Sequence, residues 1–122
     1  MDITPALVEG AQRITAYSAQ FIRVNEENFT PPIIVQAMCV DEWKAPALTV
    51  YGVETLLEQL DDTEVLLIGA GASGAFLDPE LRQIIREKTG AGVEVMSTGA
   101  ACRTYNVLLA EGRKVAAALM QL

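Results

Sequence analysis

The second half of the chain alternates short apolar segments with segments of helical periodicity, and this alternation constrains the fold more than any other feature. The apolar segments are Glu64–Ile68, Val93–Ser97 and Val115–Met120. Each is short and apolar enough to form a strand, buried on both faces where it is central. Two segments with helical spacing separate them, which predicts a β-α-β-α-β order. Crossovers of this length normally join parallel strands with right-handed connections.

Residues with known positional preferences mark the ends of the helices. The predicted helices are Val50–Leu60, Pro79–Lys88 and Gly99–Glu111. Thr49 is the expected N-cap of the first, and Asp78 followed by proline is a common helix start. Either Ser97 or Thr98 can cap the last helix, and Gly112 provides its left-handed end.

The first half of the chain is predicted to form β-strands. The expected strands are Arg13–Tyr17, Phe21–Val24, Ile33–Val40 and an edge strand at Glu42–Ala45. The polar segment Asn25–Asn28 between the second and third strands is typical of a hairpin turn. Residues 1–12 show no strand pattern, and we expect a lead-in that frays. Residues 13–122 then form a single α/β domain, since 122 residues suffice for one ordinary core.

The net charge of the chain limits the classes of molecule that it is expected to bind. Nine basic residues stand against sixteen acidic ones, which gives a net charge of −7. Such a surface repels nucleic acid and anionic membranes, so neither is an expected partner. No apolar run approaches the ~18–20 residues of a membrane span. The start, MDITPALVEG, lacks the basic and apolar regions of a secretory signal, so we expect a cytoplasmic protein without membrane insertion.

The amino-acid composition also excludes several kinds of catalytic and metal-binding site. The chain has no histidine, which excludes histidine general bases, Ser-His and Cys-His pairs, and histidine metal ligands. Its two cysteines, Cys39 and Cys102, form no CxxC motif and no disulfide framework. The carboxylates show no paired-acid pattern. We therefore expect no catalytic residue, no metal and no cofactor.

A glycine run follows the first apolar strand of the second half. Residues 69–74, GAGASG, are a literal GxGxxG. In a dinucleotide-binding fold the helix begins inside such a run, so that its amides meet the pyrophosphate. Here the helix signal comes only at Asp78-Pro79, and the expected acidic residue at the end of the next strand is missing, because Glu94 lies inside that strand. The spacing therefore disfavours classical NAD binding.

The glycine loop nevertheless occupies a position where open α/β sheets bind ligands. The carboxyl ends of neighbouring parallel strands lie at one edge of a sheet. The loop at 69–73 would then face the start of the helix Gly99–Glu111, whose free amides favour an anion. The residues of this candidate cleft are Gly69, Gly71, Ser73, Thr98, Cys102, Thr104 and Asn106.

Each candidate also has an ordinary structural explanation. Gly69 and Gly71 can serve backbone geometry, and Thr98 can satisfy the helix amides as a cap. The helix dipole favours a thiolate at Cys102, but small cysteines are common in cores. Asn106 is unfavourable in mid-helix, and its side chain can instead bond to a neighbouring loop.

Several motifs together resemble a known family. The segment Val93–Leu119 reads VEVMSTGAACRTYNVLLAEGRKVAAAL, and EVLLIGAG, FLDPELR and ITAYSAQFIRVN precede it. These motifs are similar to a family of small α/β domains that includes a mitochondrial assembly factor for respiratory complex I and an adipogenesis-associated domain protein. The resemblance is to the proteobacterial single-domain members and covers about Ile14 to Leu119. Thr98, Ala101, Thr104-Tyr105-Asn106 and Glu111-Gly112-Arg113 carry most of its specificity.

The resemblance implies a fold and a range of functions. The fold is the Mth938-like one: three layers around a mixed, mostly parallel central sheet, with the last strand antiparallel and an additional small antiparallel β layer. The short link at Gly112-Arg113 is compatible with an antiparallel last strand. The family has no established enzymatic activity or cofactor, so the resemblance supplies neither. The first hypothesis is a non-catalytic protein-interaction or respiratory-complex assembly protein with a protein partner. The alternative is an anion- or nucleotide-binding protein, or an enzyme, that uses the candidate cleft.

Overall fold

The computed structural model describes residues 10–122, so most of the predicted lead-in lies outside the described residues. The strands are β1 (Ile14–Tyr17), β2 (Ile22–Val24), β3 (Glu27–Phe29), β4 (Ile33–Gln36), β5 (Cys39–Glu42), β6 (Val65–Gly69), β7 (Gly92–Met96) and β8 (Val115–Leu119). The helices are α1 (Val50–Gln59), α2 (Pro79–Thr89) and α3 (Thr98–Ala110). Strands β4 to β8 form a five-stranded sheet in the order β5-β4-β8-β6-β7, and β1-β2-β3 form a separate antiparallel sheet.

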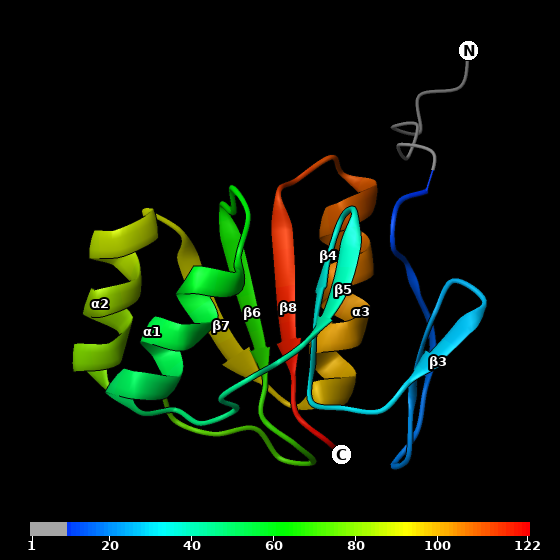
Figure 1. The fold of residues 1–122 in the computed structure, drawn as a ribbon, viewed down its shortest axis with the longest axis horizontal. Coiled ribbons are helices and arrows are strands. Elements are labelled where there is room, and N and C mark those ends of the chain that lie inside the picture. The colour runs from blue at the N-terminus through cyan, green and yellow to red at the C-terminus, as the bar shows by residue number, and fades with distance from the viewer. Residues whose placement is uncertain (1–9) are drawn as a thin grey trace.

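The layers agree with the predicted α/β class. Helices α1 and α2 lie together on one side of the large sheet, while α3 covers the other side and the small sheet lies beside α3 (Figure 1). Alternate residues of the central strands face the two sides. Ile34, Leu66 and Ile68 pack in the α1–α2 core, and Val35 and Leu67 pack in the core that α3 and the small sheet share. This mixed, three-layer arrangement confirms the predicted fold class.

The last strand, β8, was expected to run antiparallel, and this expectation is wrong for its pairing with β6. Strand β8 runs parallel to β6 and antiparallel only to β4. The 13 residues of α3 rise about 20 Å, which exceeds the ~17 Å of a five-residue strand. The helix therefore returns the chain to the opposite end of the sheet, and the short link at Gly112-Arg113 starts β8 in the same direction as β7.

The predicted strand Ile33–Val40 is in fact a hairpin. Strands β4 and β5 pair antiparallel, with Val35 opposite Val40, and the turn between them is Ala37-Met38. Neither turn residue is a glycine, proline or asparagine, so the local sequence carries no turn signal. Strand β4 lies between β8 and β5, and all four of its residues are buried, with Val35 and Ile34 in the cores on the two faces of the sheet.

The helix starts follow the local sequence closely. Thr49 caps α1, because its Oγ1 accepts a 3.0 Å hydrogen bond from the amide of Gly52. Asp78 caps α2, with Oδ1 2.9 Å from the amide nitrogen of Glu80. Ser97 caps α3 through a 3.2 Å bond from the amide of Ala100, which resolves the choice between Ser97 and Thr98.

Side chains from two helices cover both outer edges of the large sheet. At β5, the Gln59 amide of α1 donates to the Glu42 carbonyl oxygen at 2.7 Å and accepts from the Lys44 amide at 3.1 Å. At β7, Arg82 of α2 donates through Nη1 to the Val93 carbonyl oxygen at 2.7 Å. These backbone groups would otherwise be free to pair with another strand.

Candidate functional site

Helix α3 holds the first strand of the chain through two neighbouring polar side chains. Asn106 donates through Nδ2 to the Ile14 carbonyl oxygen at 2.6 Å and accepts through Oδ1 from the Ile14 amide at 3.0 Å. The fully buried Tyr105 donates from its hydroxyl to the Gln12 carbonyl oxygen at 2.7 Å. Asn106 therefore bonds to the backbone of another element, as expected, but that element is strand β1 and not a loop.

A pocket of ≈ 200 Å³ lies beside this attachment, between β1 and α3. Its lining consists of Ile14, Thr15, Ala16, Tyr17, Cys102, Arg103 and Asn106. We call it the β1–α3 pocket. At its edge, the Arg103 guanidinium donates through Nη1 to the Tyr17 hydroxyl. The pocket therefore brings together a cationic group, a phenol and a thiol from segments far apart in the sequence.

The thiol in this pocket is not activated. Burial raises the pKa of Cys102 to about 12, although the nearby Arg103 charge acts in the opposite direction. Burial thus outweighs the contribution expected from the helix dipole, and the group is a neutral thiol at physiological pH. Cys102 packs in the core that α3 shares with the small sheet. Cys39 is half-buried in β5.

The glycine loop packs directly on the start of α3. The Thr98 hydroxyl accepts from the Gly71 amide and donates to the Met120 carbonyl oxygen, both at 2.9 Å. The Thr98 amide donates to the Gly71 carbonyl oxygen at 2.8 Å. A Cβ on Gly69 would lie 2.8 Å from the Thr98 Cα, and Gly71 has a φ of +91°. Both glycines are therefore needed for backbone geometry.

The candidate cleft residues consequently fall into separate groups. Gly69, Gly71 and Thr98 meet at the end of β6, whereas Cys102 and Asn106 line the β1–α3 pocket. Ser73 is exposed in the loop, and Thr104 is half-buried on α3 outside the pocket lining. Ligand binding by any of these residues stays a prediction.

The structure adds pocket residues that the sequence reasoning missed, above all those of β1. Tyr17 lies 86 positions before Arg103, and the sequence gives no direct sign of this contact. The adjacent polar residues Tyr105 and Asn106 were the available signal, because an asparagine in mid-helix is unfavourable unless its side chain finds partners on another element.

No metal centre or membrane-spanning helix is found in the part of the chain that the structure describes. Among residues 10–122, no group of three or more histidine, cysteine, aspartate or glutamate side chains could hold a metal ion. Within the same residues, no helix is both long and apolar enough to cross a bilayer.

A comparison with models of protein families shows to which family the chain belongs. The model of a family described as "protein of unknown function (DUF498/DUF598)" matches residues 14–120. The chain belongs to this family. The resemblance seen in the sequence motifs is therefore confirmed, and the DUF498 match covers all the elements from β1 to β8.

Individual DUF498 relatives differ in what is known of them. The chain is 33% identical over 110 residues to NADH dehydrogenase (ubiquinone) 1 alpha subcomplex assembly factor 3 of Xenopus tropicalis, which covers 88% of this chain and 60% of the frog protein. It is 36% identical to an uncharacterized protein of Rhodobacter capsulatus, over 91% of this chain and 86% of that protein. The chain thus spans less than two thirds of the frog assembly factor.

A solved structure supports the fold independently. The solution structure of a Bordetella pertussis protein, described as an Mth938-like domain, superposes with a TM-score of 0.77 at 30% identity. The match covers 99% of this chain and 92% of the Bordetella chain. The Mth938-like fold predicted from the motifs is therefore confirmed.

The geometry of the glycine loop leads to a prediction about dinucleotides. Because the Gly71 amide and carbonyl already bond to Thr98, we expect NAD and NADP at millimolar concentration to leave the amide NMR signals of residues 69–74 unmoved. Specific, saturable shifts in this loop would contradict the assignment of Gly69 and Gly71 to backbone geometry. ATP serves as the control for non-specific phosphate effects.

Proposed function

We propose that the chain is a non-catalytic interaction protein that assists the assembly of a membrane-associated respiratory complex. The observation that carries this proposal is the similarity to the Xenopus assembly factor over 88% of the chain. The neutral, buried Cys102 thiol agrees with a non-catalytic role. A cytoplasmic site of action, with a protein as partner, belongs to the same proposal.

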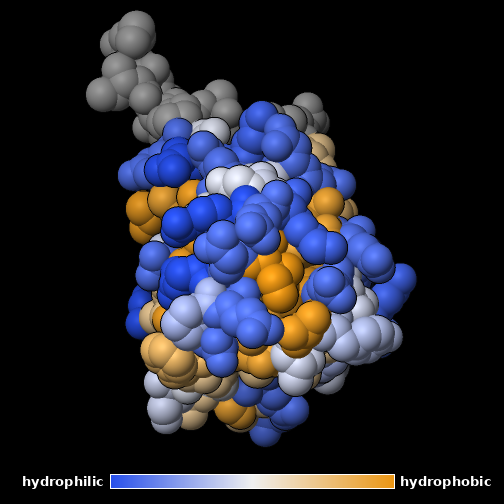
Figure 2. All heavy atoms as spheres, turned by 90° about the vertical axis from the view of Figure 1, so that its left-hand side faces the viewer, coloured by the Kyte–Doolittle hydropathy of each residue, from blue (hydrophilic) through white to orange (hydrophobic). Residues whose placement is uncertain are grey.

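The proposal requires a surface that can bind another protein. Three large apolar side chains are exposed at the start of α1 and in the loop before α2: Val50, Tyr51 and Phe76. Both segments lie at the same end of the molecule (Figure 1), and Figure 2 shows apolar atoms exposed among hydrophilic ones on the side that α1 and α2 cover. Aromatic side chains are enriched in binding hot spots.

Affinity capture from native cell extract tests the proposal. A tagged chain should recover subunits or assembly proteins of a respiratory complex above the level of a tag-only control. Recovery of none of these proteins would overturn the assembly role.

A substitution at Phe76 tests whether the exposed loop before α2 contacts the partner. Its side chain is 81% exposed, so Phe76→Ser should change the free energy of unfolding by no more than about 0.5 kcal/mol. If the loop contacts the partner, the same substitution should lower recovery of that partner severalfold.

Met38→Ser is the matched control, because Met38 is 58% exposed in the β4–β5 turn at the opposite end of the sheet. Denaturant melts of both variants establish that they fold equally well. Equal recovery with both variants would exclude Phe76 from the interface.

A further inference from the structure

The β1–α3 pocket contains a cation that no carboxylate of the described chain neutralises. The ion pairs within residues 10–122 use Lys88, Arg113 and Lys114, and none involves Arg103. A guanidinium carries five N–H donors, and the Tyr17 hydroxyl engages the Nη1 group alone. Arg103 is exposed, and its place in the lining of this pocket leaves its free donors open to an external anion.

The absence of a side chain at Gly99 makes room for this arginine and its neighbour. A Cβ on Gly99 would lie 3.1 Å from the Tyr17 Cε1 and 3.4 Å from the Arg103 Nη1, so the absence of a side chain lets both groups lie against α3. The Tyr17 oxygen accepts from Arg103, which leaves the phenol proton available to a ligand. Guanidinium and phenol are thus two donors held side by side, as anion recognition requires.

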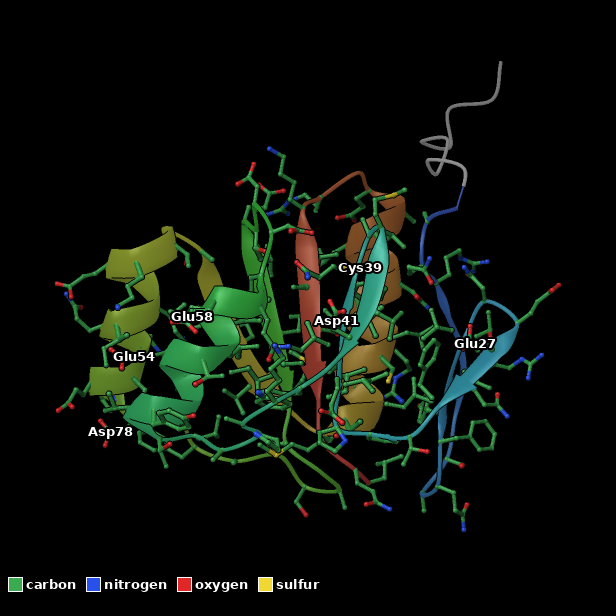
Figure 3. The ribbon with its side chains drawn as sticks, viewed as in Figure 1. Glu27, Cys39, Asp41, Glu54, Glu58 and Asp78 are labelled. Atoms are coloured by element: carbon green, nitrogen blue, oxygen red, sulfur yellow. The ribbon has the colours of Figure 1, made fainter. Side chains whose placement is uncertain are left out.

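The other polar groups of the pocket do not favour a cation. The Asn106 oxygen is engaged by the Ile14 amide, and the Thr15 hydroxyl bonds to the Asn25 carbonyl oxygen at 2.9 Å. Glu54, Glu58 and Asp78 belong to the α1–α2 side of the large sheet (Figure 3), away from this pocket. The side-chain donors that the lining leaves free are therefore those of Arg103 and Tyr17, and the lining contains no carboxylate.

The volume of the pocket and its apolar lining residues limit the size and the charge of a ligand. Its ≈ 200 Å³ is below the roughly 300–1,000 Å³ of sites for drug-sized molecules. Ile14 and Cys102 are almost fully buried and offer apolar contact, whereas a single guanidinium neutralises only one negative charge. We propose that the β1–α3 pocket binds a small monocarboxylate, with the carboxylate on Arg103 and Tyr17 and a short hydrocarbon chain against Ile14 and Cys102.

An NMR titration with butyrate, at an ionic strength matched with sodium chloride, tests this site independently of partner capture. Butyrate should produce saturable shifts of the amides of residues 15–17 and of the Arg103 Nε–H signal, with a dissociation constant in the millimolar range. Butan-1-ol, which has the same chain without the charge, should not saturate these signals. Inorganic phosphate should bind more weakly than butyrate.

Two variants and a matched control complete the experiment. Arg103→Gln should weaken butyrate binding roughly tenfold to a hundredfold, as expected for loss of a charged hydrogen-bond donor. Tyr17→Phe should weaken it to a smaller degree. Arg86→Gln, which removes an exposed arginine from α2, should leave binding unchanged.

Four outcomes would overturn the proposal. These are the absence of saturable shifts in the wild-type protein, equal affinity in Arg103→Gln and wild type, equal binding of butan-1-ol, and tighter binding of phosphate. Partner capture by the same Arg103→Gln protein then shows whether the assembly role stands without this site.

Discussion

Asn106→Ala should lower the free energy of unfolding by about 2–4 kcal/mol. The substitution leaves the Ile14 amide and carbonyl without their partners, and an unsatisfied buried group costs ~1–3 kcal/mol. The better helix propensity of alanine returns only about 0.5 kcal/mol. Denaturant melts measure the loss, and hydrogen exchange should show that the β1 amides lose protection before those of β8.

Val107→Ala is the matched control for Asn106. Val107 is the next residue of α3 and is 57% exposed, so its replacement should be neutral or slightly stabilising. We also expect Asn106→Ala to retain partner capture under conditions where it is folded. Full stability combined with loss of a ligand or partner would contradict the structural role.

Thr98→Val should cost a comparable amount, about 2–3 kcal/mol. Valine has nearly the same shape, so the fully buried site keeps its packing. The substitution removes the hydroxyl that joins the Gly71 amide to the Met120 carbonyl oxygen, and both groups lose this partner. Chemical denaturation provides the measurement.

Thr98→Ser separates the hydroxyl from the methyl group. Serine retains both hydrogen bonds and should lose only about 1 kcal/mol, the transfer free energy of one buried methyl. A serine variant less stable than the valine variant would show that packing, and not the hydroxyl, holds the glycine loop on α3.

The sequence predicts best those features that depend on neighbouring residues. The caps at Thr49 and Asp78 involve bonds within three residues and are confirmed, and the third cap is Ser97, one of the two residues that the sequence offered. The antiparallel direction expected for β8 from the resemblance and the short link at Gly112-Arg113 was wrong with respect to β6, because the length of α3 returns the chain across the sheet, as in an ordinary parallel crossover.

In the candidate site, too, features that depend on neighbouring residues differ from features that depend on contacts between distant segments. The backbone role of Gly71 follows from its own φ and from a loop near in sequence to β6. The contact of Tyr17 with Arg103 depends instead on the packing of β1 against α3, and the burial of Cys102 depends on the same long-range contact. Tertiary burial thus reversed the reactivity that the helix position alone favours at Cys102.

The covered edges of the large sheet limit the ways in which a partner can bind. With Gln59 bonded to the outer backbone of β5 and Arg82 to that of β7, a peptide that added itself as a sixth strand would first have to displace these side chains. The same protection opposes stacking of identical molecules into continuous β ribbons. At the large sheet, recognition through loops and side-chain surfaces, which leaves its hydrogen bonding intact, is therefore the favoured mode.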